Sequence, residues 1–132
     1  MIAADTNVWA RAILGDHPRQ SPLARNQLEA SRTKEGLFVP LIVLAELAWV
    51  LGSAEGWSNS RVLDALDLLL SLDRVEVEAH AIASEALAAA HKGGAGLADH
   101  LILGIARARG ARTVLTFDRK LGKNPRASLL KV

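Results

Sequence analysis

The chain of 132 residues contains no cysteine. This absence excludes disulfide bonds, thiolate metal sites and cysteine nucleophiles, and it is typical of proteins in a reducing compartment. We also expect no signal peptide, because the first apolar run ends at Asp5 and no basic region precedes it. The composition therefore predicts a cytoplasmic protein.

An uninterrupted apolar run of membrane-spanning length is also lacking. Residues 37–54 come nearest to one, but Pro40 and Glu46 interrupt them. We interpret this stretch as the end of a strand followed by a buried helix, and we expect no association with a membrane. Half of the residues are hydrophobic, which is enough for the core of a single domain over residues 1–132.

Charge is unevenly distributed, although the net charge is only +2. Residues 1–103 carry 8 basic and 13 acidic side chains, a net charge of −5, whereas residues 104–132 carry 8 basic and one acidic side chain, a net charge of +7. We call residues 104–132 the basic tail. A surface of this kind binds phosphate through counterion release or serves only as a solvated face, and the sequence leaves both interpretations open.

Short apolar runs alternate with helical patterns along the chain, an order typical of parallel α/β proteins. We expect a three-layer α/β/α fold with a central parallel sheet of four to five strands. The expected strands are residues 1–4, 37–39, 75–77, 113–117 and 128–132. The expected helices are residues 8–14, 18 or 21 to 32, 41–51, 61–72, 79–91 and 97–109.

Four acidic residues stand out by position. Asp5 and Asp118 directly follow expected strands, at the end where parallel sheets bind ligands, and Glu46 and Asp99 lie near the starts of apolar helices. Carboxylates that converge repel one another unless a cation neutralises them. Oxygen ligands without cysteine or a histidine pair favour Mg²⁺ or Mn²⁺, which lower the pKa of a bound water for attack on phosphorus. For Asp5 alone, a role as the N-cap of the next helix is equally consistent.

The sequence around these acids resembles the four motifs of the PIN-domain family, especially the VapC-type toxins of type II toxin–antitoxin pairs. The motifs are Asp5-Thr6-Asn7, Glu46 within Leu-Ala-Glu-Leu, Ala98-Asp99-His100-Leu101-Ile102 and Thr116-Phe117-Asp118-Arg119-Lys120-Leu121. The resemblance implies a metal-dependent endoribonuclease that hydrolyses RNA phosphodiesters with a metal-activated water. It also implies a homodimer that a cognate VapB-type antitoxin silences.

The family's functional residues transfer to specific positions of this chain. The resemblance implies four metal-binding and catalytic acids, which are Asp5, Glu46, Asp99 and Asp118. It also implies polar side chains that support these acids, which are Thr6, Asn7 and Thr116, with Thr116 bonded to a carboxylate. Many relatives carry a further acid two positions after Asp118, where this chain has Lys120, so a site with one metal and a site with two both stay open.

Other functions compete with the RNA nuclease. A PIN module that cleaves weakly would act mainly as an RNA- or protein-binding partner. A DNA nuclease has a similar acidic site, because a metal at the phosphate does not touch the 2′-hydroxyl. A phospho-acceptor signalling domain is disfavoured, because it needs an aspartate after the third strand and only Glu78 is there.

The histidines and tryptophans receive no catalytic role. We expect His100 to be a packed or groove-lining side chain rather than a general base. The other histidines are expected at the surface, at positions 17, 80 and 91. The three tryptophans are interpreted as core or dimer-interface aromatics rather than nucleotide-stacking groups, at positions 9, 49 and 57.

Overall fold

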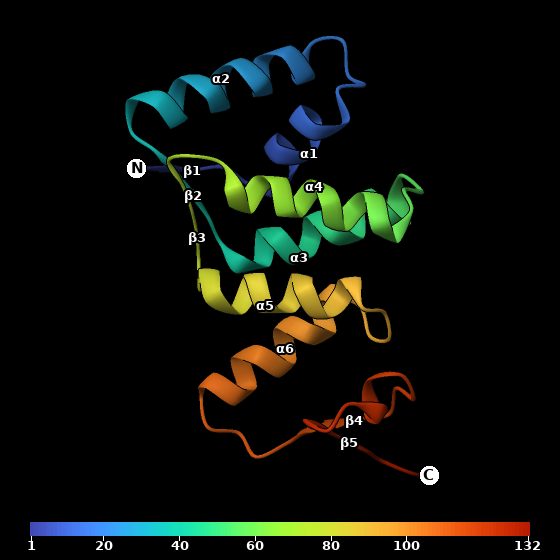
Figure 1. Cartoon of the computed structure of the whole chain (residues 1–132). Coiled ribbons are helices and arrows are strands. Elements are labelled where there is room, and N and C mark those ends of the chain that lie inside the picture. The colour runs from blue at the N-terminus through green and yellow to red at the C-terminus, as the bar shows by residue number, and fades with distance from the viewer. The chain divides into compact units, whose positions relative to one another are not determined.

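The computed structural model describes all 132 residues, which form two compact units over residues 1–80 and 81–132 (Figure 1). The elements of the first unit are β1 (Ile2–Ala3), α1 (Thr6–Leu14), α2 (Gln20–Lys34), β2 (Leu37–Val39), α3 (Leu41–Trp49), a π-helical turn (Val50–Ala54), α4 (Asn59–Ser71) and β3 (Val75–Val77). The second unit holds all of α5 (His80–His91) except its first residue, then α6 (Leu97–Ala108), β4 (Val114–Thr116), a 3₁₀ turn (Leu121–Lys123) and β5 (Ala127–Leu129).

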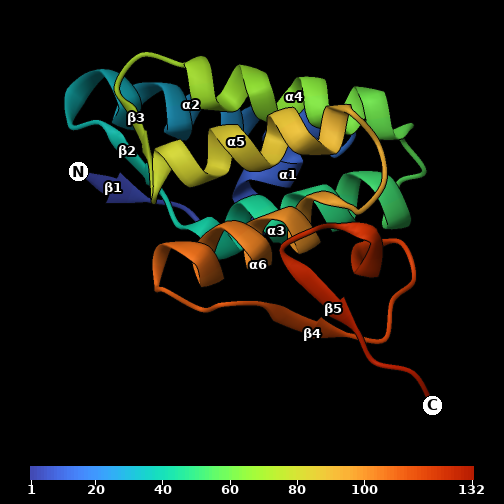
Figure 2. The same cartoon turned by 60° about the horizontal axis from the view of Figure 1, so that its bottom comes forward.

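All strands of the protein pair in parallel, as the sequence predicted (Figure 2). In the first unit the strand order is β1-β2-β3, with Ile2 opposite Leu37 and Leu37 opposite Val75. In the second unit β4 pairs with β5 in a separate two-stranded sheet. The α/β class is thus confirmed, but the single sheet of four to five strands is wrong, because the backbone hydrogen bonds divide the strands into groups of three and two.

The core of the first unit is built from aliphatic side chains of β2, α3 and α4. Val39, Leu44, Leu47 and Leu66 are completely buried. Burying each leucine contributes about 1.5–3 kcal/mol relative to leaving it in water. This packing fixes one face of α3 in the core, so the opposite face, which carries Glu46, is the exposed one.

Specific caps fix where the helices of the first unit begin and end. Asp5 caps α1, and Gly15 ends it in the left-handed conformation at φ +65°. Ser58 caps α4, and its hydroxyl accepts a hydrogen bond from the backbone N–H of Arg61 at 3.2 Å. Pro40, at the N-cap of α3, offers no side-chain cap, and the carboxylate of Glu78 accepts a hydrogen bond from the Leu41 N–H at 2.8 Å instead.

His17 also caps a helix, a role that its sequence position did not indicate. Its Nδ1 accepts hydrogen bonds from the backbone N–H groups of Arg19 at 3.2 Å and Gln20 at 2.9 Å. The side chain is half-buried, whereas we expected it at the surface, and its hydrogen bonds stabilise the start of α2.

Small residues let the helices of the second unit approach one another. Helix α5 buries three alanines and Leu87. A Cβ added at Gly104 on α6 would lie 2.9 Å from Cγ2 of Ile82 on α5, closer than real contacts allow. Glycine at this position therefore permits the close contact between α5 and α6.

None of the helices combines the length and the apolar character that crossing a membrane requires.

Candidate active site

Asp5 follows β1 and is the N-cap of α1, one of the two roles that the sequence left as alternatives. Its Oδ1 accepts a hydrogen bond from the backbone N–H of Val8 at 3.2 Å, as expected of an N-cap. Its other carboxylate oxygen makes no hydrogen bond, and the residue is exposed. The cap therefore fixes the side chain while one oxygen stays available to a ligand.

Glu46 lies beside the Asp5 motif. The hydroxyl of Thr6, the first residue of α1, donates a 2.8 Å hydrogen bond to Oε1 of Glu46 on α3. This bond joins two residues 40 positions apart. It brings the first and second motifs of the sequence together at one pocket of about 440 Å³, lined by Asp5, Thr6, Asn7, Glu46, Trp49 and Val50.

No basic side chain neutralises this pair of acids. Ion pairs join Arg11 to Asp16 and Arg32 to Glu29, whereas neither Asp5 nor Glu46 belongs to an ion pair. The pocket therefore presents carboxylate, hydroxyl and amide oxygens and excess negative charge. This donor set fits a hard divalent cation such as Mg²⁺ or Mn²⁺.

Asp99 and Asp118 belong to the second unit. Asp99 is half-buried in the first turn of α6. Asp118 is exposed just after β4, and its Oδ1 accepts a hydrogen bond from the Leu121 N–H at 2.9 Å. That Asp99 and Asp118 complete the site of Asp5 and Glu46 stays a prediction.

The supporting polar residues differ in part from what the sequence suggested. Thr116 Oγ1 accepts a hydrogen bond from the backbone N–H of Asp118 at 2.9 Å, whereas we expected a bond to a carboxylate. Asn7 lines the pocket of Asp5 and is exposed, and it is Thr6 that bonds to an acid. The threonine directly after a strand-ending aspartate was thus the position that connects the two motifs.

Trp49 is the pocket residue that sequence reasoning missed. Of its two expected places, the core is wrong, because 64% of its surface is exposed, and the dimer interface stays a prediction; Trp49 lines the pocket with Asp5 and Glu46. Trp9, in contrast, is only 5% exposed, as expected of a core residue. The helical period could have indicated the place of Trp49, because Trp49 follows Glu46 by three positions and therefore lies on the same face of α3.

His100 agrees with the expectation of a packed or groove-lining histidine. It is half-buried and lines a cavity of about 410 Å³ within the second unit. Glu85, Asn124 and Arg126 line the same cavity.

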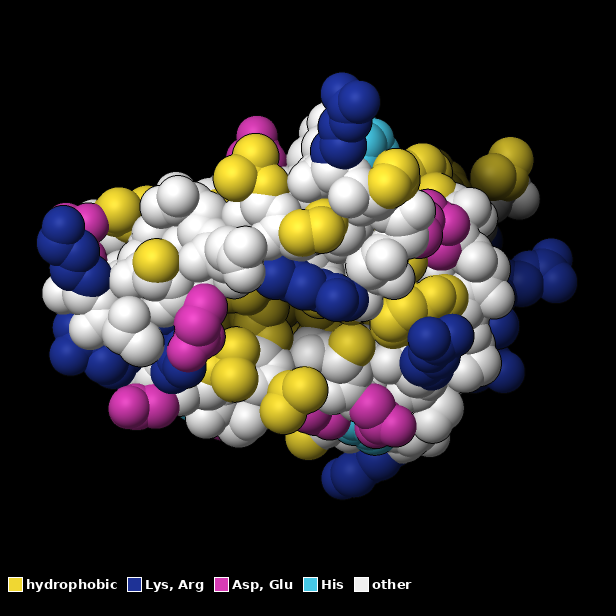
Figure 3. All heavy atoms as spheres, turned by 90° about the horizontal axis from the view of Figure 1, so that it is seen from above, with side chains coloured by type: hydrophobic (Ala, Val, Ile, Leu, Met, Phe, Trp, Pro, Cys, Tyr) yellow, Lys and Arg dark blue, Asp and Glu magenta, His cyan; other side chains and the backbone are white.

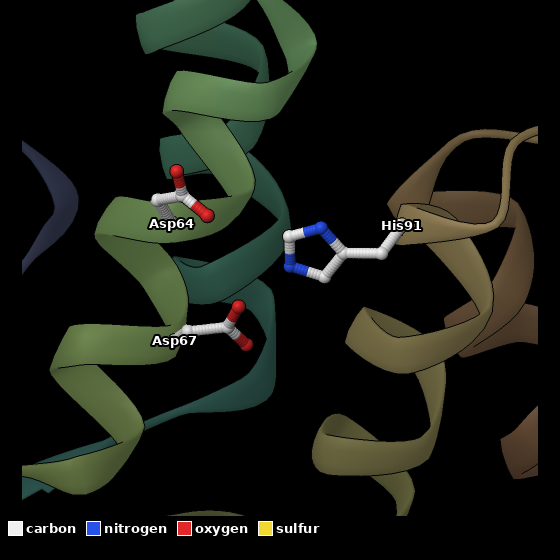
Figure 4. A group of neighbouring side chains, drawn as sticks. All are labelled: Asp64, Asp67 and His91. Carbon is white, nitrogen blue, oxygen red and sulfur yellow. The ribbon is translucent and has the colours of Figure 1, made fainter.

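Other acids lie outside the pocket. Asp64 and Asp67 project from α4, three positions apart, and both are exposed (Figure 4). Exposed carboxylates of one helix are common without a metal, so we assign none to this pair. On the face shown in Figure 3, acidic and basic side chains are interspersed with apolar ones.

Comparison with known proteins places the chain in a family. The model of the PIN domain matches residues 2–127. Among curated proteins there is no match. A solved structure described as "Crystal structure of VapBC2 from Rickettsia felis bound to a DNA fragment from their promoter" is 26% identical, with 98% of this chain and 98% of that chain covered and a TM-score of 0.42. Because the family model spans nearly the whole sequence, the chain belongs to the PIN-domain family.

Proposed function

We propose that the protein is a metal-dependent endoribonuclease and the toxin of a type II toxin–antitoxin pair. PIN domains are generally nucleases, and this chain belongs to that family. The observation that carries the proposal is the pocket in which Asp5 and Glu46 lie together, joined through Thr6 and without a neutralising base.

The residues of the pocket have separate tasks in the proposed reaction. Asp5 and Glu46 would hold Mg²⁺ or Mn²⁺ against the scissile phosphate. When bound, the cation polarises a phosphoryl oxygen and lowers the pKa of a bound water. Thr6 holds the Glu46 carboxylate through Oε1, and the α1 cap holds Asp5 through Oδ1, so both side chains are oriented before the substrate arrives.

The second unit supplies further acids and a basic surface. We propose that Asp99 and Asp118 join the same metal site. This proposal rests on the resemblance of the four motifs, in their order and spacing, to those of the PIN-domain family. All eight basic residues of the basic tail are exposed, and none forms an ion pair. Unpaired cations on one unit suit binding to an RNA backbone, so we expect affinity to fall steeply as salt rises.

The proposed partners are RNA, a cognate VapB-type antitoxin and a second copy of the chain. Support for the antitoxin and for the homodimer comes from the resemblance of the motifs to those of VapC-type toxins.

Cleavage assays with matched variants test the nuclease. Purified protein is incubated with single-stranded and structured RNA, and with DNA of the same sequence, in Mg²⁺, Mn²⁺ or EDTA. We expect RNA cleavage that requires metal and falls at least 100-fold in Asp5→Asn and Glu46→Gln, because each removes a charged ligand. Asp64→Asn is the control, since it removes an exposed acid of α4 outside the pocket.

Each other outcome contradicts a defined part of the proposal. Cleavage that survives both pocket variants would place the chemistry elsewhere. Preferential cutting of DNA would favour the DNA nuclease. If folded wild-type protein binds Mn²⁺ and RNA but cuts neither nucleic acid, the protein is the weakly catalytic binding module.

A further inference from the structure

The indole of Trp49 is an exposed aromatic surface at the rim of the acidic pocket. Its side chain lines the pocket together with Asp5, Thr6 and Glu46, and 64% of its surface is in contact with solvent. Glu46 and Trp49 are three positions apart on α3, which places their side chains next to each other on one helical face. A ligand that fills the pocket therefore meets carboxylates and an indole together.

The other two tryptophans have different surroundings. Trp9 is buried in the core of the first unit. Trp57 is half-buried, and the guanidinium carbon of Arg61 lies 3.7 Å from the centroid of its ring. Trp49 has neither a packed environment nor a cation over its ring, so among the three tryptophans only Trp49 is largely exposed.

The chemistry around Trp49 narrows the class of ligand. Four of the six pocket residues are polar, and two of these are acids without a basic partner. A wholly apolar partner would leave these polar groups desolvated and unpaired, which is costly. A nucleotide held through a divalent cation matches both the acids and the indole. Its phosphate faces the cation, and its base has a flat apolar face that can contact the indole.

We propose that Trp49 stacks on a nucleobase of the RNA beside the phosphate held at Asp5 and Glu46. This inference rests on the proposed function and adds a binding residue to it. Stacking tolerates different bases, because every base has a π face, so Trp49 would contribute affinity for unpaired RNA more than sequence preference. Paired bases hide their faces in the helix, so the contact favours single-stranded over double-stranded substrate.

The test compares Trp49→Leu with the matched control Trp57→Leu. Leucine is a good helix former and keeps apolar volume while removing the aromatic ring. For a mixed-sequence single-stranded oligoribonucleotide with Mn²⁺, we expect KM to rise roughly tenfold in Trp49→Leu while kcat changes little. Stopped-flow mixing with RNA should quench tryptophan fluorescence in wild type and Trp57→Leu, and this quench should be absent in Trp49→Leu.

Several results would overturn the inference, with folding checked by circular dichroism. An unchanged KM and a retained quench in Trp49→Leu would show that the indole does not meet the base. Unchanged RNA binding together with a shift from dimer to monomer would assign Trp49 to an interface between copies. If wild type cleaves no RNA, the proposed function fails separately, and the quench alone then supports or refutes the stacking contact.

Discussion

At the scale of single residues, the hydrogen bond from Thr6 to Glu46 is the contact that assembles the pocket. It joins α1 to α3 and orients one carboxylate oxygen of Glu46 at 2.8 Å. Thr6→Val keeps the shape of the side chain and removes the donor, so we expect kcat/KM for RNA to fall roughly tenfold. Thr6→Ser should restore most of the activity because it keeps the hydroxyl.

The matched control for Thr6→Val is Thr33→Val. The hydroxyl of Thr33 donates only to backbone oxygens of Glu29 and Ala30 within α2, outside the pocket. Steady-state cleavage should be unchanged in this control. Equal losses in the two variants would mean that the Thr6 bond has no special role.

A second pair of residues, Glu29 and Arg32, links stability to pH. A hydrogen bond from Arg32 lowers the pKa of the Glu29 carboxyl below its usual range. The two hydrogen bonds measure 2.7 and 3.1 Å, and Arg32 also donates to the backbone oxygen of Asp73 at 3.0 Å. A carboxyl whose pKa is lowered by folding stabilises the fold above its unfolded pKa, and this contribution disappears as the pH falls through the folded pKa.

Glu29→Gln should therefore lower the thermal midpoint slightly at neutral pH, where the pair is intact. The difference from wild type should vanish in acid, because Glu29 is then protonated in both states. Both residues are at the surface, so the effect is small and decreases with salt. The control is Glu55→Gln, at an exposed acid that forms no ion pair, and its thermal midpoint relative to wild type should not depend on pH in this way. If the midpoint of Glu29→Gln differs from that of wild type by the same amount at every pH, the linkage is refuted.

The sequence pattern predicts where single acids lie but not which residues they contact. A strand followed at once by Asp5 predicted an acid at the ligand-binding end of the sheet, and the N-cap role of Asp5, the stated alternative, is confirmed by its hydrogen bond from the Val8 N–H. The sequence did not show that Glu46 bonds to Thr6, because the contact spans 40 positions and depends on how α1 packs on α3. The core position expected for Trp49 is wrong, because an aromatic residue on an apolar helix usually packs inward, whereas Trp49 shares the exposed face of Glu46.

At the scale of elements, α3 is the helix on which the pocket depends. Its inner face is buried through Leu44 and Leu47, both with no exposed surface, while Ile42 is 65% exposed. Leu47→Ala removes core volume and leaves a cavity, so we expect its free energy of unfolding to be about 3 kcal/mol lower than that of wild type. Ile42→Ala on the same helix should change stability by less than about 0.5 kcal/mol.

Urea denaturation of both variants measures this difference. Similar losses at Leu47 and Ile42 would mean that α3 is not anchored by its inner face. Because Glu46 lies on this helix, we also expect Leu47→Ala to weaken RNA cleavage at temperatures near its unfolding midpoint.

Most elements were predictable because their boundaries are coded locally. Gly15, Pro40, Ser58 and Gly110 mark helix or strand ends in the sequence, and the structure uses three of them directly as caps. The end of α3 was less visible, since residues 50–54 continue it as a π-helical turn whose altered hydrogen bonding has no sequence signature.

At the scale of the whole molecule, strand pairing was the least predictable feature. The parallel direction follows from alternating strands and helices, but the division into β1-β2-β3 and β4-β5 depends on contacts between distant segments. Local patterns locate each strand approximately, with the last one expected at residues 128–132 and found at Ala127–Leu129, but they do not specify its neighbours. The four acids are subject to the same limit. Their motifs predict a shared site, but local sequence patterns do not specify which acids are neighbours in space.

A double-mutant comparison tests whether acids of both units act as one site. Asp5→Asn and Asp99→Asn each remove one proposed ligand, and each should lower kcat at least 100-fold. If the two acids hold one metal, the double variant should be little worse than either single variant, because a site that acts as a unit is already disabled by the first loss. Losses that multiply in the double variant would instead indicate independent contributions, and calorimetric titration with Mn²⁺ would then show binding retained in one single variant.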